Sequence, residues 1–485
     1  MLLLFIAVLH ACPVMSEVHL VVLVHGLWGS PAHLAAAKGE LERAWTGHVS
    51  QRRTSVTGSS DPTITTTLES DEMELVVMIA GGMTSQLTYD GIDVCASRVA
   101  YEVDEQIDRL LSKGKKVTHF SVTGYSLGGL VARYLIGLLQ AREPCFFDEY
   151  KPFSFSTIAT PHLGIPRYNT LLSTVLCWLG ARLLSRSGEQ LYVADQYSEE
   201  DPRPLLEIMA DPSLVFFQAL SRFEKIHIFA NGVNDTTVPY PSSAIEVVDH
   251  FAEWETQGLM IDTDEADIIR SWSKPSDVPI KRKTWSVSIG TLPPVLRYRF
   301  PFNYIILLLF PIMLPLVVIL MTARLSLDTR RSRRRLQQLA QAAPTRARHA
   351  SRPSSIPSAS GLSVQGLREA IRRVERSIES DLIATMDTPD RRTMHVSPPV
   401  HSQEVTLKVR LSDSQLRMAL WLNALPLVKF VSWYPDVTNS HAVSIVRWVR
   451  NAGARTDPRD PIPFPAHLRG RGLLKRWARG VLGQL

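Results

Sequence analysis

Ser126 lies in the pentapeptide Gly124-Tyr125-Ser126-Leu127-Gly128, with a glycine two residues before it and another two residues after it. A serine hydroxyl becomes a useful nucleophile beside a base, a carboxylate that orients the base, and amide donors for the developing oxyanion. The two glycines permit a sharp turn that lifts the hydroxyl above a sheet. This short pattern occurs often by chance, so its meaning depends on the elements around it.

The segments on either side of Ser126 predict a strand and a helix. Residues 117–122 form a short apolar, β-rich run, and residues 127–139 are typical of a helix. Strand, sharp turn and helix, in that order, are the context in which such a serine acts as a nucleophile. We therefore predict Ser126 as the nucleophile and the backbone N–H of Leu127 as one oxyanion donor.

The second oxyanion donor is expected from an earlier loop between a strand and a helix. Residues 18–24 form a continuous apolar run typical of a buried parallel strand, and residues 25–29 follow it as His-Gly-Leu-Trp-Gly. We predict the backbone N–H of Leu27 as this donor. The alternative is that His25 and Gly26 only shape a turn.

In folds that place a nucleophilic serine on such a turn between a strand and a helix, the acid follows the serine in the chain, on a loop that leaves a later strand. Residues 226–230 predict such a strand, and Asp235 stands on the polar loop after it. We predict Asp235 as the residue that orients the base. An aspartate that only caps a turn is the alternative.

The base is the hardest choice among the fourteen histidines. His441 stands between a predicted strand at 428–433 and a predicted last helix at 442–449, where this fold places its histidine. His250 would replace it if the C-terminal region were a separate module, whereas His162 fits the wall of the site better. This mechanism requires no metal and no cofactor.

The alternation of strands and helices predicts an α/β fold, with a mostly parallel sheet and helices on both faces. The length of 485 residues suits one such domain with insertions. We predict an apolar N-terminal extension, the main part of the α/β domain, a membrane-associated segment, a basic and Ser/Pro-rich disordered linker, a C-terminal part of the domain with the histidine, and a basic tail. These segments are residues 1–16, 17–275, 300–324, 325–363, 364–452 and 453–485, respectively.

The formal net charge of +6 is concentrated in one segment. Residues 324–352 contain nine arginines and one acidic residue, so the rest of the chain is slightly acidic. No nucleic-acid-binding motif accompanies this patch, and we expect a membrane neighbour instead of nucleic acid. The four cysteines show neither CxxC nor metal-ligand spacing, which favours a reducing compartment; they are Cys12, Cys95, Cys145 and Cys177.

Two segments near the N-terminus are open to more than one interpretation. Residues 1–11 are apolar but lack the basic start and the cleavage site of a secretory signal, so they predict either a short membrane anchor or a true start at Met15. Residues 48–70 are rich in Ser and Thr and lack periodicity, which predicts a flexible loop or an insertion.

Residues 304–323 form a run of twenty residues without a charge, long enough to reach across a bilayer core. A single crossing would separate Ser126 from His441, and basic residues flank the run at both ends. With Pro311 and Pro315 inside it, we expect a hairpin that dips into one leaflet, with the arginines on anionic head groups. A bitopic span or a buried helix is the alternative. Residues 171–184 predict either a lid or an ordinary core helix.

Six short motifs, taken in order, carry a resemblance that extends over most of residues 18–450. Together they resemble the eukaryotic putative serine esterase family, in particular its fungal lipid-droplet phospholipase and lipase branch. The extra residues 48–70 and the apolar start depart from that family. The motifs are His-Gly-Leu-Trp-Gly at 25–29, Tyr-Asp-Gly-Ile-Asp at 89–93, Gly-Tyr-Ser-Leu-Gly-Gly at 124–129, Thr-Pro-His-Leu-Gly at 160–164, Asn-Asp-Thr-Thr-Val-Pro at 234–239 and Asn-Ser-His at 439–441.

The resemblance implies an α/β-hydrolase that cleaves carboxylic esters of glycerophospholipids. It also implies an association with lipid droplets. Because the basic residues on both sides of residues 304–323 favour the cytosol, we expect the protein on the cytosolic face of a lipid droplet or of the endoplasmic reticulum membrane. Two other functions are compatible with the same residues: an inactive scaffold on a lipid surface, and an acyltransferase in which an alcohol replaces water. The residues do not indicate a protein partner.

Overall fold

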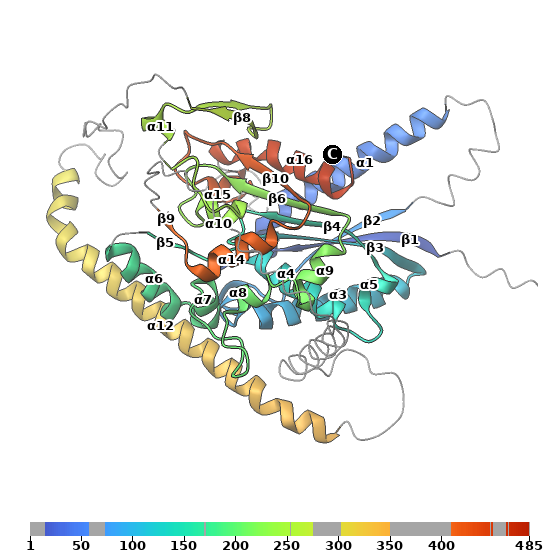
Figure 1. Cartoon of the computed structure of the whole chain (residues 1–485), viewed down its shortest axis with the longest axis horizontal. Coiled ribbons are helices and arrows are strands. Elements are labelled where there is room, and N and C mark those ends of the chain that lie inside the picture. Colours follow the sequence, from blue (N-terminus) through green and yellow to red (C-terminus); the bar gives the residue numbers. More distant parts are fainter. Residues whose placement is uncertain are drawn as a thin grey trace, which may run out of the picture.

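The computed structural model describes residues 15–57, 73–168, 171–252, 254–274, 302–349, 409–446, 448–449, 462–463 and 465–484. Six strands form one sheet in the order β10-β6-β4-β3-β1-β2 (Figure 1). All five neighbouring pairs are parallel. The strands are β1 (Ser16–Val24), β2 (Glu74–Ile79), β3 (Lys115–Tyr125), β4 (Lys151–Ile158), β6 (Lys225–Asn231) and β10 (Leu427–Ser432).

The side chains of strand β1 show that the sheet is covered on both faces. Successive side chains of a strand point to opposite faces. Leu20 and Val22 belong to one buried apolar cluster, and Val21 and Leu23 belong to another. A strand buried on both sides has a continuous apolar sequence, which is the pattern of residues 18–24.

The helices lie in two layers, one on each face of the sheet (Figure 1). The predicted α/β class, a mostly parallel sheet with helices on both faces, is confirmed. The layer of the first cluster includes α3 (Ile92–Leu111), α4 (Leu127–Gln140), α8 (Leu205–Ile208), α9 (Val215–Ser221) and α14 (Asp413–Leu422), and the opposite layer includes α1 (Ala35–Thr57) and α16 (Arg471–Val481).

Shorter elements surround this frame. Three two-stranded sheets pair β5 (Arg167–Tyr168) with β9 (Val409–Arg410), β7 (Met260–Thr263) with β8 (Ile269–Ser273), and β11 (Trp448–Val449) with β12 (Ile462–Pro463). The remaining helices are η1 (Pro31–Leu34), η2 (Ser85–Tyr89), α5 (Phe146–Glu149), α6 (Leu171–Leu183), α7 (Ser185–Leu191), α10 (Tyr240–Ala244), α11 (Trp254–Gln257), α12 (Phe302–His349), α15 (Ser440–Val443) and η6 (Pro465–Gly470).

The hairpin expected at residues 304–323 is wrong, because α12 continues as one helix from Phe302 to His349 through both prolines (Figure 1). A proline removes a helical hydrogen bond and can bend the helix, but a reversal also needs turn residues. Residues 304–323 contain no Gly, Asn or Asp that would favour one. Among the residues that the structure describes, no helix is both long and apolar enough to cross a membrane.

The disordered linker expected from residue 325 is also wrong over residues 325–349, which continue α12. The described side chains of this basic stretch include three buried polar ones, Asp328, Thr329 and Ser332. A helix can be strongly basic and still pack on a protein when its few non-basic polar residues share one face, as these do at i, i+1 and i+4. Residues 350–408, with the rest of the linker, lie outside the described residues.

The basic tail expected from residue 453 contains a helix of the core instead. In α16, Leu473, Leu474, Trp477 and Val481 are buried in the second apolar cluster, and Trp477 donates a hydrogen bond to Thr123 on β3 at 3.1 Å. Their spacing of three and four residues gives α16 one apolar face. The last helix was expected at 442–449, where α15 ends at Val443.

The segment expected to be a loop at 48–70 begins with helix, because α1 continues to Thr57. Residues 58–72 and the apolar residues 1–14 lie outside the described residues.

Candidate active site

Ser126 stands between β3 and α4 in a backbone conformation that few non-glycine residues adopt, with φ 56° and ψ −129°. Such a conformation costs on the order of 1–3 kcal/mol and persists only where its surroundings hold it. Here the N–H of Ser126 donates to Ile158 O at 2.9 Å, and its carbonyl accepts from Gly129 N at 3.0 Å. The strained turn is therefore tied to the neighbouring strand β4 and to the first turn of α4.

Glycines let the loop at 25–29 approach Ser126 directly. A Cβ added to Gly26 would lie 2.7 Å from Ser126 Cβ and 3.2 Å from its Oγ. A Cβ on Gly128 would lie 2.2 Å from Val24 O. Since real Cβ atoms do not come so close, only glycine allows this packing. The backbone of residues 25–29 thus lies against the serine.

The two residues expected to supply oxyanion donors flank this contact. Leu127 is the first residue of α4, so its N–H belongs to the helix start, where amides lack helical partners and the dipole favours negative charge. Leu27 directly follows Gly26. Within the same loop, His25 Nδ1 donates to Gly26 O at 3.1 Å, and burial lowers the pKa of His25, so its imidazole is neutral.

Asp235 is buried at the end of β6 and accepts hydrogen bonds on both oxygens. Thr237 N and Val238 N donate to Oδ1 at 2.9 and 2.8 Å, and Asn231 Nδ2 donates to Oδ2 at 2.8 Å. Burial alone would raise the pKa of Asp235, but His441 and the hydrogen bonds outweigh it and hold that pKa below its usual value. Asp235 is therefore ionised at neutral pH.

His441 lies on α15, just after β10, and its Nδ1 donates to Asp235 Oδ2 at 2.9 Å. The carboxylate fixes the tautomer of the neutral ring, because Nδ1 must carry the proton and Nε2 keeps its lone pair. Tyr125 braces the same residue: its hydroxyl donates to His441 O at 3.0 Å, and the two ring centroids are 5.0 Å apart.

The structure therefore brings together the residues that the sequence placed in one site. Tyr125, which contacts His441, is bonded directly to Ser126, so the serine and the imidazole lie on adjoining backbone segments. Among the described hydrogen bonds there is none between Ser126 Oγ and His441. Such bonds are often long in the absence of substrate and shorten in the reacting complex.

The two other histidines considered lie in different surroundings. His250 packs on Trp272, with ring centroids 5.1 Å apart. His162 is fully buried, and its Nε2 is 2.9 Å from Thr157 Oγ1. Burial, with Arg133 nearby, lowers the pKa of His162 well below its usual value, so its ring is neutral and internal.

Sequence reasoning missed two residues that support the site, Asn231 and Tyr125. Asn231 donates to Asp235, and its Oδ1 accepts from the hydroxyls of Ser432 and Ser444 at 2.7 and 2.9 Å. It therefore connects β6 with β10 and the segment after α15. The signal for Asn231 was its place at the end of a strand, four residues before the acid. For Tyr125 it was the variable position inside the serine motif.

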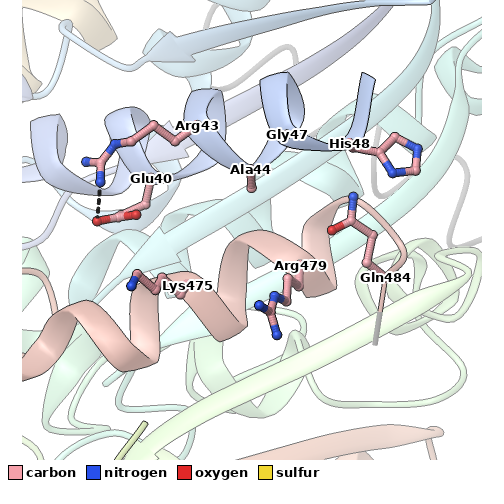
Figure 2. Close-up of a pocket in the computed structure, with 8 residues that line it drawn as sticks. All are labelled: Glu40, Arg43, Ala44, Gly47, His48, Lys475, Arg479 and Gln484. Atoms are coloured by element: carbon pink, nitrogen blue, oxygen red, sulfur yellow. Dashed lines mark hydrogen bonds and ion pairs between the residues drawn. The ribbon is translucent and has the colours of Figure 1, made fainter. Parts of the chain in front are cut away.

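A cavity of about 340 Å³ lies away from these residues, between α1 and α16 (Figure 2). Its walls include Arg43, Lys475 and Arg479, and one carboxylate, Glu40, which is paired with Arg43 at 2.8 Å. None of the residues predicted for the chemistry lines it. The candidate active site is therefore defined by its side chains and not by this cavity.

Residues 15–245 match the sequence family described as putative serine esterase (DUF676). This part of the chain is similar to that family. The matched esterase region includes Ser126 and Asp235 and ends before His441. The assignment agrees with the serine elbow and with the loop packed against it.

Fungal relatives of the esterase region are described as putative lipases. One from Schizosaccharomyces pombe, C4A8.10, is 38% identical over 134 residues, which are 27% of this chain and 17% of that protein. One from Saccharomyces cerevisiae, ROG1, is 28% identical over 217 residues, which are 44% of this chain and 30% of that protein. The chain thus spans less than a third of the length of either relative.

A solved structure with some similarity is that of a putative cell surface hydrolase from Lactobacillus plantarum. It has 14% sequence identity and a TM-score of 0.20, and the match covers 47% of this chain and 74% of that one. The fold described above is defined by its own sheet order and register.

Proposed function

We propose that this protein is a serine-dependent carboxylic ester hydrolase, a lipase or phospholipase that acts on glycerolipids through an acyl-enzyme. The observation that carries the proposal is the strained elbow at Ser126, adjoining the Asp235–His441 pair in which Nδ1 and Oδ2 are 2.9 Å apart. Strain of this kind concentrates at functional sites. The esterase family of residues 15–245 supports the same reaction class.

In this mechanism, His441 Nε2 takes the proton of Ser126 Oγ while Oγ forms a bond to the acyl carbon of the ester. Ionised Asp235 stabilises the imidazolium that results. The N–H groups of Leu27 and Leu127 hold the oxyanion of the tetrahedral intermediate. His441 then protonates the leaving alcohol oxygen as its bond to the acyl carbon breaks. A water molecule, deprotonated by the same imidazole, then attacks the acyl carbon. The bond from that carbon to Oγ breaks, the imidazolium returns its proton to Oγ, and the carboxylic acid leaves.

A lipid substrate is supported by apolar surface on two neighbouring helices. On α12, the side chains of residues 316–321 are all exposed, with Ile319 and Leu320 at 61% and 60%. On α6, which packs against α12, Val175 and Trp178 are exposed at 57% and 56%. Contiguous exposed apolar side chains are typical of surfaces that bind a partner or a membrane.

We propose that this surface rests on a lipid droplet or on the cytosolic face of the endoplasmic reticulum membrane. Arg324, Arg330 and Arg331 are exposed on the same helix. Near an anionic lipid surface, each arginine would contribute about 1 kcal/mol to binding. The relatives described as lipases are in agreement with a lipid substrate.

The reaction class is tested by labelling the purified protein with a fluorophosphonate and comparing it with Ser126→Ala. We expect labelling only in the unsubstituted protein, together with release of free fatty acid from mixed phospholipid and triacylglycerol emulsions. Absence of labelling in a folded protein would favour a scaffold. Labelling with acyl transfer to an added alcohol, and no free fatty acid, would favour an acyltransferase. Lipid analysis of the products identifies the ester and the acyl position.

A further inference from the structure

The motif Tyr-Asp-Gly-Ile-Asp at 89–93 has no part in the proposed chemistry, although it lies between the candidate active site and α12. Tyr89 ends η2, and Ile92 begins α3. One side of η2 contacts the loop at 25–29, and α12 packs on the same short helix. The motif therefore connects the proposed oxyanion loop to the helix with the exposed apolar surface.

Asp90 joins this motif to α12 through a fully buried carboxylate, whose exposed fraction is 0%. Arg335 donates to it from Nη2 at 2.7 Å and from Nε at 3.1 Å, and Ser332 Oγ donates at 2.6 Å. A second guanidinium, that of Arg98 on α3, donates at 2.6 Å. Arg335 Nη2 also donates to Gln86 O on η2, at 3.1 Å. One carboxylate thus holds α12, α3 and η2 together.

Other contacts hold the C-terminal half of α12 against the protein, and we call it the docked half. Thr329 Oγ1 donates to Leu183 O at 2.5 Å, and Ser185 Oγ donates to Ser332 Oγ at 3.2 Å. Paired guanidinium and carboxylate groups have strict geometry, and a buried carboxylate that loses a partner is costly. A shift of α12 would therefore have to break the Asp90 contacts or move η2 with it.

Other residues of η2 hold the loop at 25–29. Trp28 Nε1 donates to Tyr89 Oη at 2.6 Å, and Trp28 N donates to Thr88 Oγ1 at 3.2 Å. Ser85 N donates to Gly29 O at 2.9 Å. Trp28 itself has φ 55°, a left-handed conformation that is unfavourable for a bulky residue. Trp28, the residue directly after Leu27, donates two of these hydrogen bonds to η2, and η2 donates the third to Gly29. Together they hold Trp28 in that conformation.

We propose that Tyr89, Asp90 and Arg335 are positioning residues for the oxyanion loop. Arg335 docks α12 on Asp90, this contact fixes η2, and η2 fixes Trp28 and so the direction of the Leu27 N–H. The inference rests on the proposed function, because it assigns these residues to the oxyanion donor of the same site. It also connects the lipid-facing helix to the catalytic loop through η2.

The test uses the full-length protein and a soluble short-chain nitrophenyl ester, so that lipid binding does not enter the measurement. Tyr89→Phe removes only the acceptor of Trp28 Nε1. Arg335→Ala removes the guanidinium contacts of α12 with Asp90 and Gln86, and leaves the Ser332 hydroxyl on Asp90. Loss of one oxyanion donor costs on the order of 100- to 1000-fold in kcat, so a misplaced donor is expected to cost about tenfold. We expect this loss in kcat for each variant, with KM unchanged.

The double variant tests whether the two residues act along one route. Because both are argued to act on the same loop, the double variant should lose about as much as either single one, instead of about 100-fold. A matched control is Glu207→Gln. Glu207 is another buried carboxylate with an arginine and a hydroxyl as partners, Arg417 Nε at 2.8 Å and Ser414 Oγ at 2.6 Å, but it joins α8 to α14. It should retain the unsubstituted kcat.

Three outcomes would overturn the inference: folded single variants with unchanged kcat, a rise in KM at constant kcat, or losses that multiply in the double variant. Failure of the proposed function itself is recognised separately, by hydrolysis that survives in Ser126→Ala. If Arg335→Ala did not fold, Tyr89→Phe and Arg335→Lys would decide. The lysine keeps the charge but loses the two-nitrogen contact with Asp90, so its kcat should fall between those of the unsubstituted protein and Tyr89→Phe.

Discussion

At the carboxyl edge of the sheet the buried polar side chains contact one another, whereas on α12 they contact the rest of the protein and leave apolar side chains outside. Asp235 and His441 are paired there at 2.9 Å. On α12, Ser332 is fully buried against Asp90, while Leu320 is exposed at 60%. In an ordinary surface helix the buried face is the apolar one. The polar groups at the edge of the sheet therefore have their partners within the protein, whereas α12 presents an apolar surface that a lipid or another partner could cover.

This difference separates two kinds of experiment. The Ser126 region should act on any accessible ester, since its geometry depends on the sheet. The apolar half of α12 should matter only when the substrate is part of a lipid surface. A soluble ester and a lipid emulsion therefore report on the two regions independently.

The largest effect is expected for Asp235→Asn, which should lower kcat by about 10⁴ on the soluble ester and on the emulsion alike. An asparagine accepts poorly where Asp235 accepts from four donors, and it favours the wrong tautomer of His441. Kinetics on both substrates, with a melting temperature to verify folding, measure it. A loss confined to the emulsion would mean that Asp235 does not take part in the chemical step, and that the two regions do not have separate roles.

Acid should weaken the sheet, because buried neutral histidines lie in its strands. Burial lowers the pKa of His19 to about 3 and that of His227 to about 4. The unfolded chain binds protons near pH 6.5, before these folded histidines do, so the free energy of unfolding falls as the pH drops from 6.5 toward 4. For His19 alone the slope is about 1.4 kcal/mol per pH unit.

Urea unfolding at several pH values measures this slope, and His19→Gln, which can still contact Ser121, should reduce it. An unchanged slope in that variant would mean that His19 is protonated in the folded protein. Emulsion hydrolysis measured at the same pH values shows whether acid affects α12 before it affects the sheet.

The catalytic edge could be predicted from sequence because each of its parts has a local signal. Ser126 lies between glycines at a strand exit, and Asp235 and His441 each follow a strand in the chain order of this fold. Parallel strands bring such exits to one edge, so order along the chain became proximity in space. The finer geometry, such as the φ of Trp28, has no such signal.

The arrangement of α12 could not be predicted in this way. Arg335 and Asp90 are 245 positions apart, and nothing in either neighbourhood marks them as partners. An apolar run taken alone indicates a membrane, and a basic run taken alone indicates solvent. The docked face of α12 instead consists of two hydroxyls, a carboxylate and the guanidinium of Arg335. The core helix α16 was missed for a different reason: its apolar spacing was present but masked by lysine and arginine on the other face.

The apolar half of α12 gives the next effect in size. Val317→Asp combined with Leu320→Asp should weaken binding to anionic phospholipid vesicles by about 30-fold, since two side chains that would each contribute on the order of 1 kcal/mol in lipid are lost. The soluble ester should be hydrolysed at the unsubstituted rate. Co-sedimentation with vesicles measures the binding.

Gln337→Asp with Gln338→Asp is the matched control, because it adds the same charge to exposed positions on the docked half of α12. That pair should bind vesicles within a few-fold of the unsubstituted protein. Equal losses in the two double variants would mean that charge alone governs binding, and that the exposed apolar side chains of α12 do not enter the lipid.

The smallest effect concerns whether α6 shares the lipid-facing surface. Trp178 is exposed beside α12, and the guanidinium of Arg182 lies 4.4 Å from its ring centroid, so the indole is held in place at the surface. An aromatic ring at a lipid boundary adds binding through its apolar body while its N–H stays wet. Trp178→Ala should therefore weaken vesicle binding about threefold and leave kcat on the soluble ester unchanged.

Trp272→Ala is the control, because Trp272 is also exposed, at 43%, but lies on β8 against His250. If both variants lost binding equally, the lipid-binding surface would not be confined to α12 and α6 and would include exposed side chains near β8.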